Sequence, residues 1–245
     1  MYIRSQIFSQ VKLTILKSHF LFLLLCWLII GIFITSTIVH AQEQDVRGWY
    51  SGTVDHELFD FLDVSLSPEI RFKDNHSQLD GWLVESEFSV KATDWFRVGT
   101  FYRFQMEKDI DIGYDKNHRF GISGKFDYKI KPIEFYYRSA YHYEYSNINS
   151  SKNGKVPEAV WRHKIQAKYD RKKVDYHPFI AFEYFQVMNP MVDRGPQKIR
   201  LKAGSDYELN KRYTISLSYV YQKDILKNNP STSHIIALDL SYDWK

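Results

Sequence analysis

A two-residue alternation of apolar and charged side chains, repeated in segment after segment, is the feature that most constrains this fold. In residues 96–107, for example, Phe96 and Phe104 share one parity, whereas Arg97 and Arg103 share the other. Successive side chains of a β-strand point to opposite faces, so this period indicates strands with one apolar and one polar face. The sequence therefore predicts an all-β fold.

The composition discriminates between two kinds of all-β fold. Aromatic residues make up 17% of the chain and charged residues 25%, and the mean hydropathy is −0.41. A transmembrane barrel accommodates both, because one face of each strand contacts lipid and the other lines the lumen. A soluble β-sandwich also alternates, but it needs neither so many outward rings nor charges on its inward face. Rings also tend to end the apolar rows, as at membrane interfaces: Trp82, Trp95, Tyr143, Trp161, Tyr169, Tyr221 and Trp244.

The number of strands is harder to predict than their type. Eleven segments alternate, but the first, at residues 48–58, is less regular, and a count that starts at Leu62 gives ten. Bacterial barrels normally have an even number of strands. Residues 48–58 are then a partial strand or an internal piece, or a missed strand raises the number to twelve. We predict a transmembrane antiparallel up-and-down β-barrel of about 10–12 strands.

The connections alternate in length, and this predicts an orientation. Short connections are expected at residues 92–94, 131–132, 171–173 and 210–211, and long polar ones at 109–117, 146–158, 189–196 and 224–233. Barrels have short periplasmic turns and long external loops. The last strand alternates up to the aromatic Trp244, which is the pattern that the barrel-assembly machinery recognises, although Lys245 follows it.

The first 41 residues resemble a secretory signal peptide. Basic residues precede an almost wholly apolar run at 20–39, and Val39 and Ala41 are the small residues of a cleavage site. An uncleaved membrane anchor is the alternative, because the run is long enough to span a bilayer. We predict cleavage near Ala41 and a barrel domain at 42–245 in the cell outer membrane. The only cysteine, Cys26, lies in this leader.

The net charge of +4 does not indicate nucleic-acid binding. The leader carries three of the 33 basic residues and none of the 29 acidic ones, so residues 42–245 have a net charge of only +1. We therefore expect no nucleic-acid partner; the expected partners are outer-membrane lipid and, during insertion, the assembly machinery. A protein or small-solute partner is not specified by the sequence.

Several short motifs resemble a known family. They are Gly48-Trp49, Pro68–Phe72, Asp74-Asn75, Leu79-Asp80, Tyr102–Phe104, Asn117–Phe120, Trp161–Lys164 and Asp206–Asn210. This pattern resembles DUF2490, an uncharacterised family of outer-membrane proteins common in Bacteroidetes. The resemblance implies a barrel in the outer membrane. It brings no substrate, cofactor or catalytic residue.

The inward parity predicts a lumen lined by charges of both signs. The predicted lumen-lining residues are Glu69, Arg71, Glu85, Glu87, Arg97, Arg103, Glu107, Arg119, Lys125, Asp127, Glu134, Arg138, Glu144, Arg162, Lys164, Lys168, Glu183, Arg200, Lys202, Asp206 and Glu208. Opposite charges on neighbouring strands can pair, and such pairs would fill a small barrel with a polar core. A narrow water-filled channel is the alternative.

One cluster could support hydrolysis. His142, Glu144 and Ser146 lie close together, and a serine beside a histidine that a carboxylate orients is an activated nucleophile. However, the alternation points His142 into the lumen and leaves Ser146 in a loop. No metal-binding, paired-cysteine or phosphate-loop motif is present, so we predict no cofactor and no metal.

These observations favour a non-enzymatic barrel with a structural or interaction role, whose external loops, chiefly 146–158, meet a partner. A narrow porin-like channel for small solutes is the first alternative. An outer-membrane lipid hydrolase that uses His142 and Ser146 is the second.

Overall fold

A computed structural model describes residues 44–109, 113–145, 158–171, 174–188, 195–225 and 231–244. The predicted signal peptide at 1–41 and its cleavage site lie outside the described residues. No helix in the described part of the chain is long and apolar enough to span a membrane.

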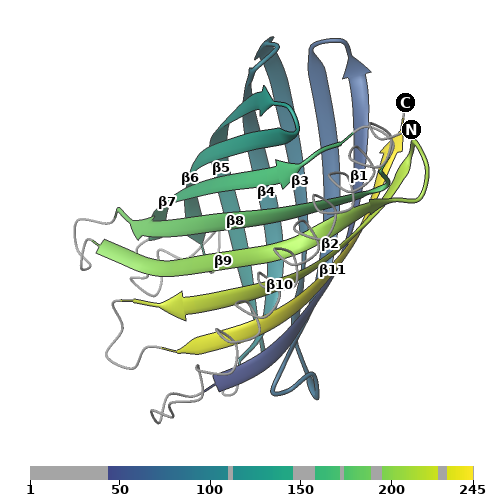
Figure 1. Ribbon diagram of the computed structural model, residues 1–245. Helices are drawn as coiled ribbons and strands as arrows, with labels where there is room; N and C mark the ends of the chain where they lie inside the picture. The colour runs from purple at the N-terminus through teal and green to yellow at the C-terminus, as the bar shows by residue number, and fades with distance from the viewer. Residues whose placement is uncertain are drawn as a thin grey trace, which may run out of the picture. The chain divides into compact units, whose positions relative to one another are not determined.

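The described residues form eleven β-strands that close into a single barrel (Figure 1). The strands are β1 (Gln44–Phe59), β2 (Leu62–Lys73), β3 (Gln78–Thr93), β4 (Phe96–Asp109), β5 (Gly113–Ile130), β6 (Ile133–Tyr145), β7 (Glu158–Tyr169), β8 (Tyr176–Val187), β9 (Gly195–Glu208), β10 (Tyr213–Asp224) and β11 (Thr232–Trp244). Each strand from β2 to β11 pairs antiparallel with its predecessor, as in an up-and-down meander. The predicted all-β barrel is therefore confirmed.

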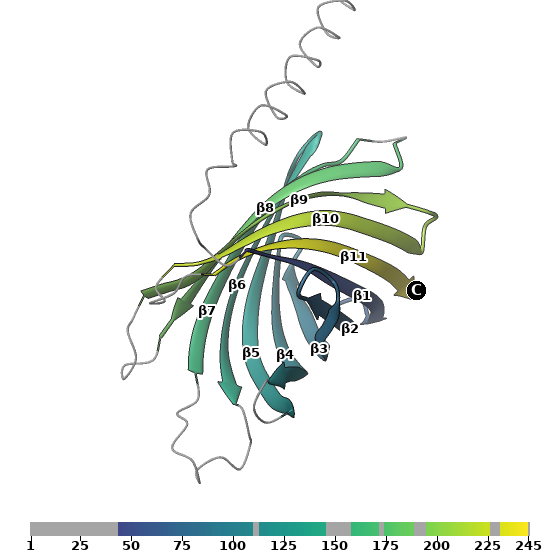
Figure 2. The ribbon, with the colours of Figure 1, turned by 90° about the horizontal axis from the view of Figure 1, so that it is seen from below.

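The barrel closes through a parallel pair, which the prediction of an antiparallel barrel did not include. β1 and β11 lie side by side (Figures 1 and 2) and pair in parallel from Gln44 with Thr232 to His56 with Trp244. An odd meander requires this, because its first and last strands run in the same direction. Eleven strands fall within the predicted range of about 10–12. The interpretation of residues 48–58 as a partial strand or an internal piece was wrong, because they belong to a full strand, whose outward row is weakened by Gly48 and Gly52.

The two faces of the strands differ as the alternation predicts. In β8, exposed and buried residues alternate one by one from Tyr176 to Glu183. The outward-facing Ile180 is 65% exposed, whereas its neighbour Ala181 is 6% exposed. Apolar side chains thus cover the outside of the barrel, and the charged parity turns inward.

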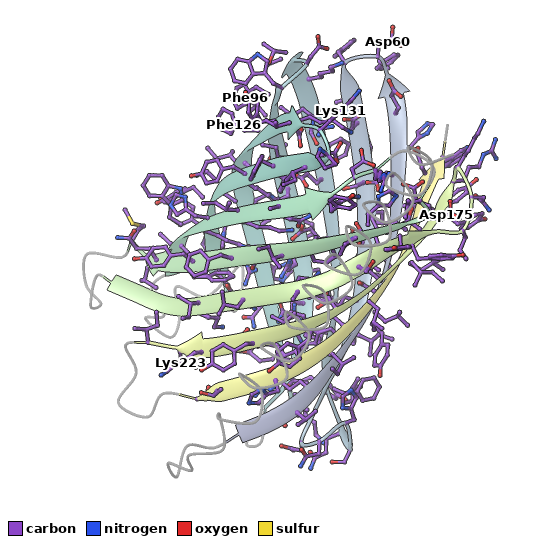
Figure 3. All side chains as sticks on the ribbon, viewed as in Figure 1. Asp60, Phe96, Phe126, Lys131, Asp175 and Lys223 are labelled. Atoms are coloured by element: carbon purple, nitrogen blue, oxygen red, sulfur yellow. The ribbon has the colours of Figure 1, made fainter. Side chains whose placement is uncertain are left out.

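The hairpins at one end of the barrel are tight. β1 and β2 are joined by residues 60–61, β3 and β4 by 94–95, and β5 and β6 by 131–132. Asp60 and Lys131 mark this short-turn end in Figure 3, and Lys223 lies toward the opposite end. The long loop expected at 109–117 is mostly strand, because β5 already begins at Gly113 and extends the hairpin beyond the apolar rows.

Aromatic side chains gather on the outside of the barrel at both ends. At the short-turn end, the rings of Phe96 and Phe126 stack with their centroids 4.5 Å apart (Figure 3). On the same outward face, three tyrosine hydroxyls each contact a histidine Nδ1 on the adjacent strand, at 2.6–2.9 Å. These pairs are Tyr102 with His118, Tyr137 with His163 and Tyr219 with His234.

Candidate functional site

Ion pairs between adjacent strands line the interior. The guanidinium of Arg103 on β4 lies 2.7 Å from Glu85 on β3, and that of Arg162 on β7 lies 2.9 Å from Glu183 on β8. Glu183 also faces Arg200 on β9 at 3.5 Å. The antiparallel register places Glu85 opposite Arg103 and Glu183 opposite Arg200. Arg162 lies two residues from Lys164, the residue opposite Glu183 on β7, and reaches Glu183 diagonally, as cross-strand neighbours can.

Other contacts reach over intervening strands. Glu87 on β3 is 5% exposed and lies 2.9 Å from the ammonium of Lys125 on β5 and 3.3 Å from the guanidinium of Arg138 on β6. Ser123 donates a further hydrogen bond to Glu87 at 2.8 Å. Such contacts are made only by side chains that extend into the barrel. They join residues of β3, β5 and β6 in one network that passes across β4.

Inward-facing rings support the interior cations. Arg71 and Arg200 lie over the ring of Trp49 at 4.6 and 4.9 Å, and Arg200 also lies 4.8 Å from the Phe185 ring. The Arg138 guanidinium lies 5.3 Å from the Phe101 ring. These inward rings were not predicted from the sequence, because aromatic residues were expected to face lipid. Their parity was the available signal: they share the face of the charged residues.

A small cavity of about 180 Å³ lies in the middle of the barrel. Its lining comes from eight of the eleven strands. The lining residues are Trp49, Ser51, Glu69, Arg71, Arg103, Arg162, Lys164, Glu183, Arg200, Lys202, Ser216, Ser218, Val220, Ala237 and Asp239. Side chains from nearly the whole wall therefore converge around a space of a few water volumes.

Two larger cavities, of about 780 and 580 Å³, lie at the short-turn end. Glu57, Asp63, Arg97 and Tyr136 line both of them. Lys164 lines the larger cavity and also the small one in the middle. The interior thus narrows from a wide, polar end to a constricted middle, with Lys164 at the junction.

A charged cluster at the rim of the short-turn end joins residues of β5, β6, β8 and β9 with Asp170, which follows β7. The Lys129 ammonium contacts Glu134 and lies 2.5 Å from Asp170, which follows β7. His177 at the start of β8 lies between Asp170 and Glu208, at 3.5 and 3.2 Å. The hydrogen bond that Lys129 donates lowers the pKa of Asp170 below its ordinary value. The Lys129–Asp170 pair therefore favours the ionised form of Asp170 at the rim.

The structure brings most of the predicted lumen-lining residues together as partners. The additional pairs are Arg71 with Glu69, Arg97 with Asp127, Arg119 with Glu144, and Lys168 with Asp206. Glu107 accepts a hydrogen bond from Gln105. Two predicted lumen-lining cations, Lys164 and Lys202, form no ion pair within the described part of the chain. The ammonium of Lys164 lies over the Tyr136 ring, and that of Lys202 lies over the Phe179 ring.

Of the residues considered for hydrolysis, His142 and Glu144 form no hydrogen bond with each other. His142 is 3% exposed inside the barrel, its ring lies 6.1 Å from the ring of Phe101, and its Nδ1 has no hydrogen-bond partner among the described residues. Glu144 accepts a hydrogen bond from Arg119 at 2.6 Å. Ser146 lies outside the described residues. Glu144 is therefore engaged with a cation and does not orient His142.

Metal ligands were not predicted. Within the described ranges, no group of three or more His, Cys, Asp or Glu side chains is arranged to hold a metal ion.

Comparison with known proteins identifies a family but no function. The sequence profile described as "Protein of unknown function (DUF2490)" matches residues 46–232. No curated protein matches the chain significantly.

Solved structures resemble the chain only distantly. The β domain of the Bordetella autotransporter BrkA is 12% identical, with a TM-score of 0.42 over 71% of this chain and 78% of that one. LpxR from Salmonella typhimurium is 9% identical, with a TM-score of 0.46 over 74% and 83%. The CymD monoaromatic hydrocarbon channel is 12% identical, with a TM-score of 0.41 over 73% and 68%.

Proposed function

The chain belongs to the DUF2490 family of proteins of unknown function, and from the geometry of its interior we propose that it is an outer-membrane barrel with a filled lumen. In this proposal the barrel has a structural or interaction role and does not act as an open pore. The 180 Å³ cavity in the middle, lined from eight strands, is the observation that carries the proposal.

The outward face supports a place in a membrane. Soluble monomers rarely expose contiguous apolar patches larger than a few hundred Å². Here large apolar side chains stand exposed on every strand, among them Leu66 at 48%, Ile122 at 63% and Leu217 at 57%. A closed barrel also satisfies its backbone hydrogen bonds internally, as a lipid environment requires. With short turns on the periplasmic side, the interior opens widest toward the periplasm.

The ion-paired interior supports the filled lumen. The guanidinium groups of Arg103, Arg162 and Arg200 project into the middle, where each pairs with a carboxylate. A hydrated solute can cross only if these pairs separate, and breaking a buried pair is costly. The role of the 146–158 loop as the partner-binding segment is an expectation on residues that lie outside the described ones.

Conductance across planar lipid bilayers tests the proposal. The wild-type protein is expected to show no stepwise conductance, because the middle of the barrel is closed. An R103A/R162A/R200A variant removes the three guanidinium groups and is expected to conduct, which provides a positive control for insertion. Stable conductance steps from the wild type at a level similar to that of the variant would contradict the filled lumen.

A narrow channel is the second candidate, and one observation favours it. Lys164 lines both the large cavity at the short-turn end and the small one in the middle, so the two spaces adjoin. In this alternative the wild type conducts small ions weakly, and Lys164→Glu changes its ion selectivity. Conductance that responds to Lys164→Glu would favour the channel over the closed barrel.

A further inference from the structure

The small cavity in the middle of the barrel carries an excess of positive charge. Six arginine or lysine side chains line it, against three carboxylates. Adding Glu85, which pairs with the lining residue Arg103, gives four carboxylates. The excess therefore remains two positive charges, although the predicted lumen as a whole carries nearly equal numbers of both signs.

The pairing within the cavity shows where this excess lies. Arg162 and Arg200 share the single carboxylate of Glu183. Among the described residues, Lys164 and Lys202 form no ion pair; their ammonium groups lie 5.5 Å from the Tyr136 ring and 5.4 Å from the Phe179 ring. These two lysines lie on either side of β8, on β7 and β9, and both line the cavity.

Unpaired cations in a confined interior need a counter-charge. Charges removed from bulk water are retained where they are paired or hydrogen-bonded. Guanidinium groups present forked N–H donors that match a planar or tetrahedral oxyanion, and lysine adds a point charge. We propose that the cavity is a binding site for a small oxyanion of the phosphate class, held by Lys164 and Lys202 with Arg162 and Arg200.

The size and access of the cavity fit this ligand. A cavity of about 180 Å³ has room for several water molecules and therefore accommodates one phosphate with a few waters. Access is from the short-turn end, because Lys164 also lines the 780 Å³ cavity there. The site therefore differs from a structural ion pair: its counter-ion enters and leaves, and it can be titrated.

Phosphate binding to the protein purified in detergent micelles tests the proposal. Isothermal titration calorimetry with inorganic phosphate, at an ionic strength held constant with the bulky anion gluconate, is expected to show saturable binding to one site. The K164Q/K202Q variant is expected to bind at least about tenfold more weakly, because both unpaired donors are gone. In buffer without phosphate its thermal stability is expected to equal or exceed that of the wild type.

Lys168→Gln is the matched control. It removes the same charge from the same face of β7, but Lys168 pairs with Asp206 at 3.1 Å and does not line the small cavity. Phosphate binding should be retained in this variant. Absence of saturable binding by the wild type, or equal binding by K164Q/K202Q, would overturn the proposal. Heat-modifiable electrophoretic migration checks that every variant is folded, and the single variant Lys202→Gln replaces the double variant if that one fails.

A second titration identifies the source of the phosphate group. Phenyl phosphate carries the same group on a ring that must remain in the larger cavity. Binding of inorganic phosphate alone identifies a free ion as the ligand. Tighter binding of phenyl phosphate identifies a phosphate group that belongs to a larger molecule extending toward the short-turn end. In both cases the proposal requires that K164Q/K202Q weakens binding.

Discussion

The middle of the barrel and its short-turn end use the same residue types with different consequences. In the middle, six cationic side chains and three carboxylates enclose 180 Å³, and Glu183 is 7% exposed. At the short-turn end, eight Lys and Arg residues and nine carboxylates line the two larger cavities, and Lys129 is 44% exposed. The two regions contain the same types of residue but differ in their balance of charge and in their exposure to water.

This difference shows that confinement, more than charge content, determines what an ionic residue does in a barrel. Exposed pairs in water contribute little. A pair removed from water becomes costly to break, because the remaining partner is left buried and unpaired. The middle should therefore respond strongly to the loss of a single charge, and the short-turn end weakly.

The largest expected effect comes from Glu183→Gln. It removes the carboxylate that Arg162 and Arg200 share, and leaves two guanidinium groups without that partner. We expect a loss of about 3–5 kcal/mol in the free energy of unfolding. Urea unfolding in detergent micelles, followed by tryptophan fluorescence, measures it.

Glu134→Gln is the matched change at the short-turn end. This substitution also removes the charge of a carboxylate that contacts a cation, Lys129, but the side chains of Glu134 and Lys129 are both more than one third exposed. The expected change in unfolding free energy is below about 1 kcal/mol. Equal losses in the Glu183 and Glu134 variants would contradict the distinction between the two regions.

An intermediate effect is expected from Gly121→Ala on β5. A Cβ atom there would lie 2.4 Å from Cζ of Phe101 and 2.7 Å from Cβ of His142, so the packed interior must shift. Overpacking of this kind is expected to cost about 1–3 kcal/mol of unfolding free energy. The same urea titration measures the change.

Gly124→Ala, three residues along the same strand, separates packing from a general effect of removing glycine. The nearest atom to its Cβ, Cε2 of Phe96, lies 3.4 Å away, at ordinary contact distance. We expect a change within about 1 kcal/mol. A larger loss at Gly124 than at Gly121 would show that the interior near Phe101 is loosely packed.

The alternation made the strands and their two faces predictable, because a period of two follows directly from strand geometry. Whether the barrel has an even or an odd number of strands was not predictable in the same way. Gly48 and Gly52 remove apolar side chains from the outward row of β1, so a complete strand resembled a partial one. The segment count of eleven conflicted with the general expectation of even-numbered barrels, so the sequence left the number open between ten and twelve.

The charged interior was predictable as a set but not as a pattern of partners. Which cation meets Glu183 depends on the register of β7, β8 and β9 and on how the sheet closes. The inward rings, such as Trp49 and Phe185, were missed because aromatic residues on the outward face are so numerous. The excess of positive charge in the middle arises because side chains from eight strands meet around one cavity. The spacing of these residues along the sequence does not show which of them meet.

The smallest effect is expected in the pH dependence of stability at the short-turn end, where Lys129 pairs with Asp170. Lys129 lowers the pKa of Asp170 below its ordinary value of 3.8. A carboxyl group whose pKa is lower in the folded protein contributes stability above its unfolded pKa, and this contribution is lost as the pH falls through the folded value. Wild-type stability should therefore decline slightly more than that of Asp170→Asn as the pH falls through and below 3.8. Because the pair is well exposed, salt should reduce the difference between the two proteins. Urea midpoints at pH 3 to 7, at low and high salt, measure it; a difference that grows with salt would exclude the ion pair as its cause.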